Sequence, residues 1–202
     1  MKTLFIPAKS KAKINTKKVL ELVKKLPKNI AITYSIQFKE IASKIKDILK
    51  DKKITSFTQV LGCSKPQFKD TDAILLIGSG KFHAISLAYE TKLPVFILSR
   101  DSLEQISKQD IELIEKKHKA AYLKYLHSNK IGVIVSTKPG QNRLKQALKL
   151  SKNKDKKHYV FLTNNINRNE FENFDIDSWV NTACPRLDMD SSVINIDKLL
   201  QD

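Results

Sequence analysis

The sequence predicts an α/β protein in which parallel sheets are flanked by helices, and three observations support this prediction. Strand-like and helix-like segments alternate along all 202 residues. Several strand-like segments are apolar throughout, which is typical of strands covered on both faces of a sheet. The helix-like segments carry apolar residues at helical spacing, so each helix has one face for packing against a sheet.

Residues 1–128 show this alternation clearly. The segment Ala73–Ile77 is wholly apolar and predicts a buried strand. Apolar residues recur at helical spacing in Thr16–Leu26, and Ser107 and Asp110 form a capping-box pattern that opens a long helix. After an apolar run at Leu4–Ile6, we expect strands at Ile30–Tyr34, Phe57–Leu61, Ala73–Ile77 and Val95–Leu98, and helices at Thr16–Leu26, Phe38–Leu49, Phe82–Glu90 and Ser107–His127.

A second αβ region follows a break in the pattern at Ser128-Asn129-Lys130. We therefore expect two similar Rossmann-like domains, residues 1–128 and residues 129–202, with one cysteine in each. The second domain is expected to contain strands at Gly132–Val135, Tyr159–Leu162 and Ser178–Thr182, and a helix at Asn142–Leu150.

The composition limits the class of function. The net charge is +16, from 37 basic and 21 acidic residues, and such a charge suits RNA or an acidic partner. The lysines are scattered over the helix faces, however, so a dedicated nucleic-acid site is not expected. No apolar stretch reaches about 18 residues, so no membrane span is expected. The apolar run near Met1 is too short for a signal peptide, which predicts a cytoplasmic protein.

The two cysteines, Cys63 and Cys184, are the first candidates for a functional site. Each follows a predicted strand, and ligands of parallel sheets bind beyond the carboxyl ends of the strands. Gly62 before Cys63 and Pro185 after Cys184 indicate shaped loops. The alternative is a pair of buried, inert cysteines. Neither lies in a CxxC pair, so a zinc site made by this chain alone is poorly supported.

A glycine loop, Gly78-Ser79-Gly80, precedes the predicted helix that contains His83. It is not a dinucleotide fingerprint, because His83 stands where that motif has its last glycine. It is not a phosphate-binding P-loop either, because Phe82 stands in place of Ser or Thr. Two interpretations stay open: an anion or ligand site at a helix N-terminus, with His83 as a ligand contact, or a tight structural turn.

A similar loop runs from Ser136 to Gln141 and precedes the next predicted helix. Lys138 in this loop could pair with a carboxylate of a ligand. A plain surface turn is the equal alternative.

Four segments, in this order, resemble motifs of the diphthamide-synthesis family, the 2-(3-amino-3-carboxypropyl)histidine synthases. The resemblance extends from about Lys2 to Asp190, and the two cysteine segments are its specific part. The segments are Ser35-Ile36-Gln37-Phe38, Gln59-Val60-Leu61-Gly62-Cys63, Ile77-Gly78-Ser79-Gly80-Lys81-Phe82-His83 and Trp179-Val180-Asn181-Thr182-Ala183-Cys184-Pro185-Arg186-Leu187.

The resemblance implies three αβ domains, each giving one cysteine to a [4Fe–4S] cluster, with thiolates suited to soft iron. The iron without a cysteine binds S-adenosylmethionine, whose cleavage gives a 3-amino-3-carboxypropyl radical that adds to a histidine of translation elongation factor 2. By this analogy Cys63 and Cys184 are cluster ligands and Arg186 is a candidate catalytic residue. The loops Gly78–His83 and Ser136–Gln141 are candidate walls of the cofactor pocket.

The chain departs from the family pattern because it begins where the second domain of the family begins. The resemblance therefore predicts a separate first-domain chain that supplies the third cysteine, and hence an oligomer. Met1 and the apolar run that follows argue against an arbitrary truncation. Two alternatives stay open: a non-catalytic structural or regulatory subunit of the same enzyme, and a basic αβ module that binds RNA.

Overall fold

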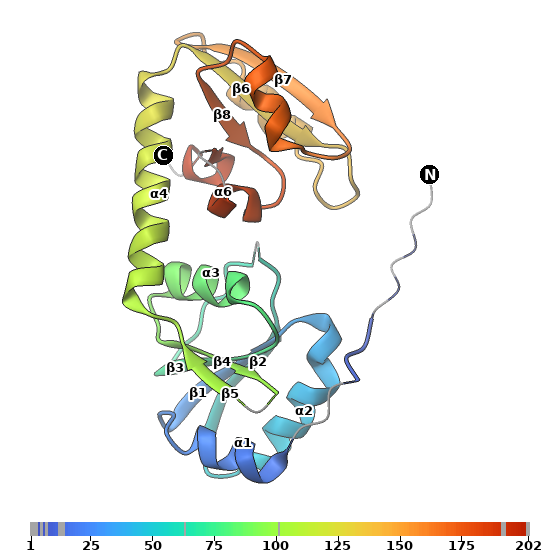
Figure 1. Cartoon of the computed structure of the whole chain (residues 1–202), viewed down its shortest axis with the longest axis vertical. Coiled ribbons are helices and arrows are strands. Elements are labelled where there is room, and N and C mark those ends of the chain that lie inside the picture. Colours follow the sequence, from blue (N-terminus) through green and yellow to red (C-terminus); the bar gives the residue numbers. More distant parts are fainter. Residues whose placement is uncertain are drawn as a thin grey trace. The chain divides into compact units, whose positions relative to one another are not determined.

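The chain forms two compact units in the computed structural model, which describes residues 4, 6, 8–11, 15–62, 64–100, 102–190 and 193–200. The units comprise Met1–Glu112 and Leu113–Asp202, and Figure 1 shows them coloured along the sequence. The division falls inside helix α4 (Lys108–His127), whereas the boundary expected from the sequence lies at the end of that helix. The reason is packing, because Ala121 and Tyr125 of α4 belong to the core of the second unit.

The first unit is built on a five-stranded sheet with the order β2-β1-β3-β4-β5. All neighbouring strands are parallel except β4 and β5, which are antiparallel. The parallel α/β architecture expected from the sequence is thereby confirmed. The strands are β1 (Asn29–Tyr34), β2 (Lys53–Gln59), β3 (Ala73–Ile77), β4 (Val95–Ser99) and β5 (Ser102–Gln105).

Alternation along the strands gives this sheet a core on each face, because successive side chains of a strand point to opposite sides. Ile30 and Ile32 face α1 (Thr16–Val23) and α2 (Lys39–Ile48), while Ala31 faces α3 (Lys81–Thr91). Figure 1 shows α3 on the opposite side of the sheet from α1 and α2.

Two features of the first sheet differ from the expectation. Strand β2 begins at Lys53, earlier than expected, because this edge strand is half-buried and its polar residues hide the strand pattern. Strand β5 was not predicted, because its four residues are polar and mostly exposed, apart from Leu103. It pairs with β4 after the chain reverses at Arg100, which has a φ of 50°.

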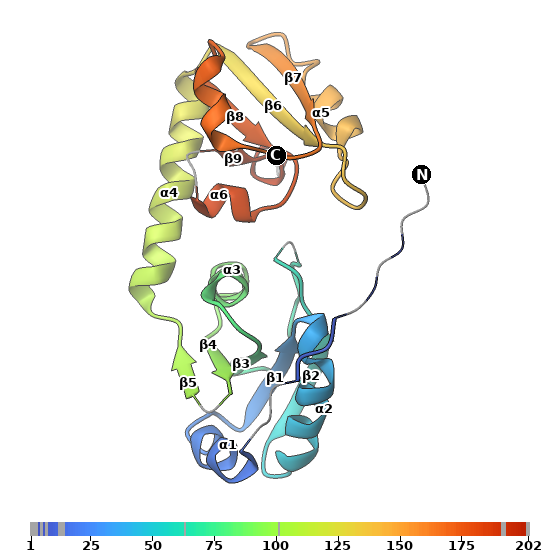
Figure 2. The ribbon, with the colours of Figure 1, turned by 45° about the vertical axis from the view of Figure 1, so that its right-hand side comes forward.

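The second unit is built on a four-stranded sheet with the order β7-β6-β8-β9, all parallel. Helices α4 and α5 (Leu144–Leu150) pack into the same core on one face of this sheet. In the view of Figure 2, α4 is seen at the left and α5 at the right. The other face is packed by Phe171 of the turn η2 (Arg168–Asn173) and Leu187 of α6 (Arg186–Asp190). The strands are β6 (Lys130–Ser136), β7 (Lys157–Thr163), β8 (Ser178–Asn181) and β9 (Ile194–Asn195), and a short turn η3 (Ile196–Lys198) follows β9.

The capping box predicted for α4 is confirmed. The Asp110 backbone N–H donates to Ser107 Oγ at 3.1 Å, and the Ser107 N–H donates to Asp110 Oδ2 at 3.4 Å. These reciprocal bonds satisfy backbone donors that the first turn of a helix leaves free. Of the apolar run near the N-terminus, Leu4 and Ile6 are exposed and lie in no helix or strand, and Phe5 is outside the described residues. No helix in the described ranges is both long and apolar enough to cross a membrane.

Candidate functional site

Three of the motif segments meet at the carboxyl edge of the first sheet. A Cβ on Gly78, directly after β3, would lie 3.6 Å from Ser35 Oγ and 4.0 Å from Phe38 Cδ2. A Cβ on Gly62 would lie only 2.0 Å from Phe82 Cε1, so the ring of Phe82 occupies the space that a side chain at position 62 would need. The fold therefore brings the Ser35–Phe38, Gly62 and Gly78–Phe82 segments together.

The backbone around Cys63 is held by serine hydroxyls. The Leu61 N–H donates to Ser64 Oγ at 2.8 Å, and the Ser64 N–H donates to the Leu61 carbonyl at 3.0 Å. Ser86 of α3 donates its hydroxyl proton to the Gly62 carbonyl at 3.3 Å. Cys63 itself lies outside the described residues. The flanking segment is nonetheless fixed against the first turns of α3.

The glycine loop of the first unit forms the turn from β3 into α3. Gly78 is buried, and Ser79 and Gly80 are exposed. Gly80 has a φ of 84°, a left-handed conformation that favours glycine, and it is the N-cap residue of α3. His83 is half-buried, and its ring contacts that of Phe82 edge-on at 5.1 Å between centroids. Both earlier interpretations of this loop, a turn and a ligand site, remain compatible with this geometry.

The loop that carries Cys184 is fixed by a buried amide. Asn181 at the end of β8 is fully buried, and its Oδ1 accepts from the Ala183 N–H at 2.8 Å. Asn181 Nδ2 donates both to the Cys184 carbonyl at 2.9 Å and to Asp188 Oδ1 at 2.7 Å. One side chain thus ties the backbone on both sides of the turn to the start of α6.

Further hydrogen bonds attach this loop to the sheet and to the helix. Thr182 is fully buried, and its N–H and hydroxyl both donate to the Ile134 carbonyl of β6, at 3.1 and 2.8 Å. The Leu187 N–H donates to the Cys184 carbonyl at 3.1 Å. The thiol of Cys184 is free and exposed, which excludes the interpretation of this cysteine as a buried core residue. The loop therefore presents a thiol to solvent from a fixed backbone.

The carboxyl group of Asp188 is strongly perturbed. Burial raises its pKa to about 7, against the lowering effect of the hydrogen bond from Asn181 and a weaker interaction with the Asn195 amide. Only 4% of the residue is exposed. Near neutral pH the charged and uncharged forms of this group are therefore comparably populated.

The other predicted residues of the second unit take different roles. Ser136 is buried, and its Oγ accepts from the Lys138 N–H at 3.2 Å, so Ser136 shapes the turn after β6. Lys138 is exposed, and the Gln141 N–H donates to the Lys138 carbonyl at 3.1 Å. Arg186 is exposed and begins α6, two positions after Cys184.

Sequence reasoning missed Asn181 and Asp188 as residues that organise the cysteine loop. The available signal was a polar residue directly after an apolar strand, since the carboxyl end of a buried strand is a costly place for an unpaired amide. The partner of that amide comes from the next helix, so the pair emerges only in the folded chain.

The described residues contain no group of three or more His, Cys, Asp or Glu side chains that could ligate an ion. One exposed thiolate on a rigid loop is suited to iron but needs further ligands from elsewhere.

The fold and site together define an α/β protein that presents a cysteine thiol at the carboxyl edge of a parallel sheet. The chain belongs to the diphthamide synthesis family, since the family model described as "Putative diphthamide synthesis protein" matches residues 1–194. The resemblance found in the motifs is thereby confirmed.

Relatives in two archaea show the same relationship. The chain is 32% identical over 209 residues to the 2-(3-amino-3-carboxypropyl)histidine synthase of Methanocaldococcus jannaschii, covering 96% of this chain and 58% of the relative. It is 31% identical over 205 residues to the enzyme of that name from Pyrococcus horikoshii, covering 93% of this chain and 60% of the relative. The chain thus spans about three fifths of the length of these relatives.

A solved structure matches the fold. The crystal structure of Dph2 from Pyrococcus horikoshii with a 4Fe-4S cluster superposes with a TM-score of 0.76 at 25% identity, covering 92% of this chain and 61% of that chain. That neighbour contains the kind of cluster that the family resemblance implies.

Proposed function

We propose that this chain forms part of an enzyme that transfers a 3-amino-3-carboxypropyl group from S-adenosylmethionine to a histidine of translation elongation factor 2. The observation that carries the proposal is the Cys184 loop, in which a buried amide holds an exposed thiol at the carboxyl edge of the second sheet. Both archaeal relatives are named 2-(3-amino-3-carboxypropyl)histidine synthase, a name that specifies the transferred group and the histidine that carries it. The elongation factor is our inference from the family resemblance.

In this proposal Cys184 and Cys63 are two of the three thiolate ligands of a [4Fe–4S] cluster. The chemistry of the thiols fits the group, because iron–sulfur clusters are held by cysteine thiolates. When bound, the cluster would supply an open iron site for S-adenosylmethionine. Asn181 would keep the Cys184 backbone in place, and Gly62 would let the Cys63 segment lie against Phe82.

The third thiolate is assigned to a separate chain that contains the first domain of the family. The sequence contains two cysteines, so a cluster with three thiolate ligands needs one thiolate from elsewhere. In our proposal this thiolate comes from a second chain. The alternative is a non-catalytic subunit that binds a complete enzyme or the elongation factor and holds no cluster.

Anaerobic co-expression with a short chain carrying the missing cysteine motif tests the proposal. We expect a brown complex with about four irons and four sulfides per complex. The variants Cys63→Ala and Cys184→Ala should lose most of that iron. The variant Leu148→Ala, at an exposed position on α5, serves as the control and should keep it.

Two results would decide against the proposal. The absence of iron from a stable complex of the two chains would favour the non-catalytic subunit. Unchanged iron content in both cysteine variants would exclude the cysteines as ligands. Transfer of radiolabel from the aminocarboxypropyl carbons of S-adenosylmethionine to elongation factor 2 then checks the reaction itself.

A further inference from the structure

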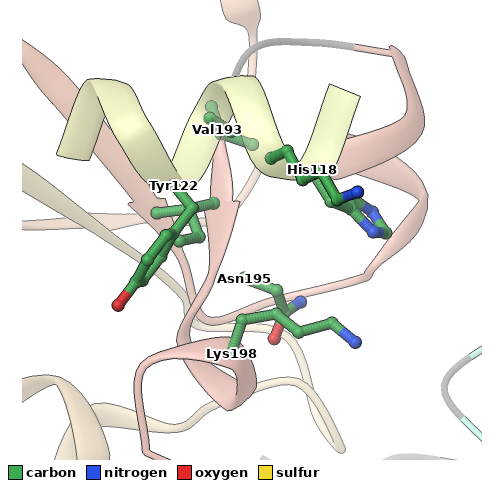
Figure 3. A pocket seen from close by; sticks show the side chains of 8 residues that line it. His118, Tyr122, Val193, Asn195 and Lys198 are labelled. Atoms are coloured by element: carbon green, nitrogen blue, oxygen red, sulfur yellow. The ribbon is translucent and has the colours of Figure 1, made fainter. Parts of the chain in front are cut away.

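The second unit contains a pocket of about 250 Å³ that none of the proposed cluster or cofactor residues lines. It lies between α4 and the segment formed by β9 and η3, and Figure 3 shows it from close by. Its volume is slightly below the range of pockets for drug-sized ligands, which suits a small organic molecule.

One side of this pocket is apolar. Ala121 and Val193 are buried, and the ring of Tyr122 forms part of the wall while remaining 39% exposed. In the view of Figure 3, Tyr122 lies on the opposite side of the pocket from the nitrogen-bearing ends of His118, Asn195 and Lys198. The lining therefore has an apolar part and a nitrogen-rich part.

Asn195 is the distinctive residue of the nitrogen-rich part. Its Oδ1 accepts from the Asp197 N–H at 3.0 Å, which fixes the orientation of the amide. The residue is only 7% exposed, and within the described part of the chain Nδ2 makes no hydrogen bond of standard geometry. The amide lies near enough to Asp188 to lower its pKa, but this interaction falls short of such a bond. A buried N–H donor without an acceptor is costly, so a ligand oxygen here would be favoured.

The charges around Asn195 specify the kind of oxygen. The lining includes two lysines, Lys119 and Lys198, and the imidazole of His118, and among the residues that the structure describes no Asp or Glu lines the pocket. The nearby Asp197 forms an ion pair with Arg143. An anionic oxygen is thus favoured and a cationic group is not.

We propose that this pocket binds a small organic carboxylate with an apolar body and no ammonium group. The carboxylate accepts from Asn195 Nδ2 and pairs with Lys198, while the body packs against Ala121, Tyr122 and Val193. An α-amino acid of similar size is disfavoured, because its ammonium group would enter a lining that contains the like-charged Lys119 and Lys198. The inference does not depend on the proposed transferase function.

Three probes of similar size test the ligand class: 3-phenylpropionate, phenylalanine and 3-phenylpropanol. They share an apolar body and differ in the carboxylate and the ammonium group. In ¹⁵N-labelled protein we expect 3-phenylpropionate to shift the side-chain amide signals of Asn195. Phenylalanine and 3-phenylpropanol should each bind about tenfold more weakly, because the ammonium group of the first is repelled by the lining lysines and the second lacks the negative charge.

Two variants test the residues. Asn195→Asp keeps the oxygen that accepts from Asp197 but replaces the donor with an acceptor, and Lys198→Met keeps most of the side-chain stem without the charge. Each should weaken 3-phenylpropionate binding by about tenfold. Lys145→Met, at an exposed position on α5, is the matched control and should not change it.

Several results would overturn the inference. They are absence of 3-phenylpropionate binding, binding unchanged by both variants, and equal binding of the alcohol. The last result would identify a purely apolar pocket, of the kind that takes an apolar side chain of a partner protein.

Discussion

The two cysteine-bearing loops are held by contacts of different kinds. In the first unit, Gly62 lies against the ring of Phe82, and the hydroxyl groups of Ser64 and Ser86 bind the backbone of Leu61 and Gly62. In the second unit, the loop is held by the fully buried Asn181 and by Asp188, which is 4% exposed. Van der Waals contact does not titrate, whereas a buried carboxyl group does. The comparison therefore predicts that only the Cys184 loop responds to pH near neutrality.

The largest effect is expected for Asp188→Asn. The pKa of Asp188 is raised from 3.8 to about 7, so between these values the folded chain keeps a proton that the unfolded chain releases. The free energy of unfolding therefore falls as pH rises through this window. An asparagine at position 188 cannot ionise, so its free energy of unfolding does not fall in this window. Its side-chain oxygen still accepts the hydrogen bond from Asn181. Above pH 7 it should be more stable than the parent by up to about 4 kcal/mol.

Unfolding by urea, followed through the fluorescence of Trp179, measures this effect in the second unit, because Trp179 is the one tryptophan in the sequence. The difference should vanish near pH 4. Asp177→Asn is the control of opposite sign, since hydrogen bonds from the Lys130 and Asn129 N–H groups lower the pKa of Asp177. Its stabilisation is present at neutral pH and is lost as pH falls, so this variant should be weaker at pH 7. A pH-independent effect of Asp188→Asn would contradict the comparison.

A second comparison contrasts the glycine–aromatic contacts of the two units. A Cβ on Gly132 would lie 2.4 Å from Trp179 Cε3. Trp179 is 8% exposed and its ring stacks on that of Phe171 at 4.5 Å between centroids, so displacing the ring would disrupt this stack. Gly132→Ala should cost about 3 kcal/mol in the free energy of unfolding, measured by Trp179 fluorescence. A cost below about 1 kcal/mol would mean that the ring yields.

The matching change in the first unit, Gly62→Ala, should cost less. The atoms in conflict are at the far end of the half-buried Phe82 ring, which can rotate toward solvent. We expect about 1–2 kcal/mol, measured by hydrogen exchange of amides in β1 and β3. In a double variant with Phe82→Ala, most of the cost of the added methyl group should disappear. Persistence of the full cost would show that the backbone, and not the ring, resists the change.

The smallest effect is expected for Ser86→Ala, which removes the hydroxyl that donates to the Gly62 carbonyl at 3.3 Å. That bond is long and only partly buried, so its loss should cost about 0.5–1 kcal/mol in the stability of the first unit. Hydrogen exchange of the amides in α3 measures it. A larger cost would mean that Ser86, more than Phe82, holds the Cys63 segment.

The sequence predicted some elements well and missed others for identifiable reasons. The strand Ala73–Ile77 has the expected bounds, because a fully buried strand must be apolar along its whole length. Strand β9 has two residues and was missed, as were η2 and α6, because such short segments show no period. The edge strands β2 and β5 escaped full prediction because solvent accepts polar side chains there.

The order of the longer strands and helices, the glycine loop before α3 and the positions of both cysteines after strands follow from the sequence by itself. They depend on local propensity and hydrophobic pattern, which neighbouring residues determine. The pairing of Asn181 with Asp188, the contact of Gly62 with Phe82 and the pocket beside Asn195 were decided only by the tertiary structure. Each joins side chains from different elements, and whether a buried polar group is satisfied depends on what the fold places beside it.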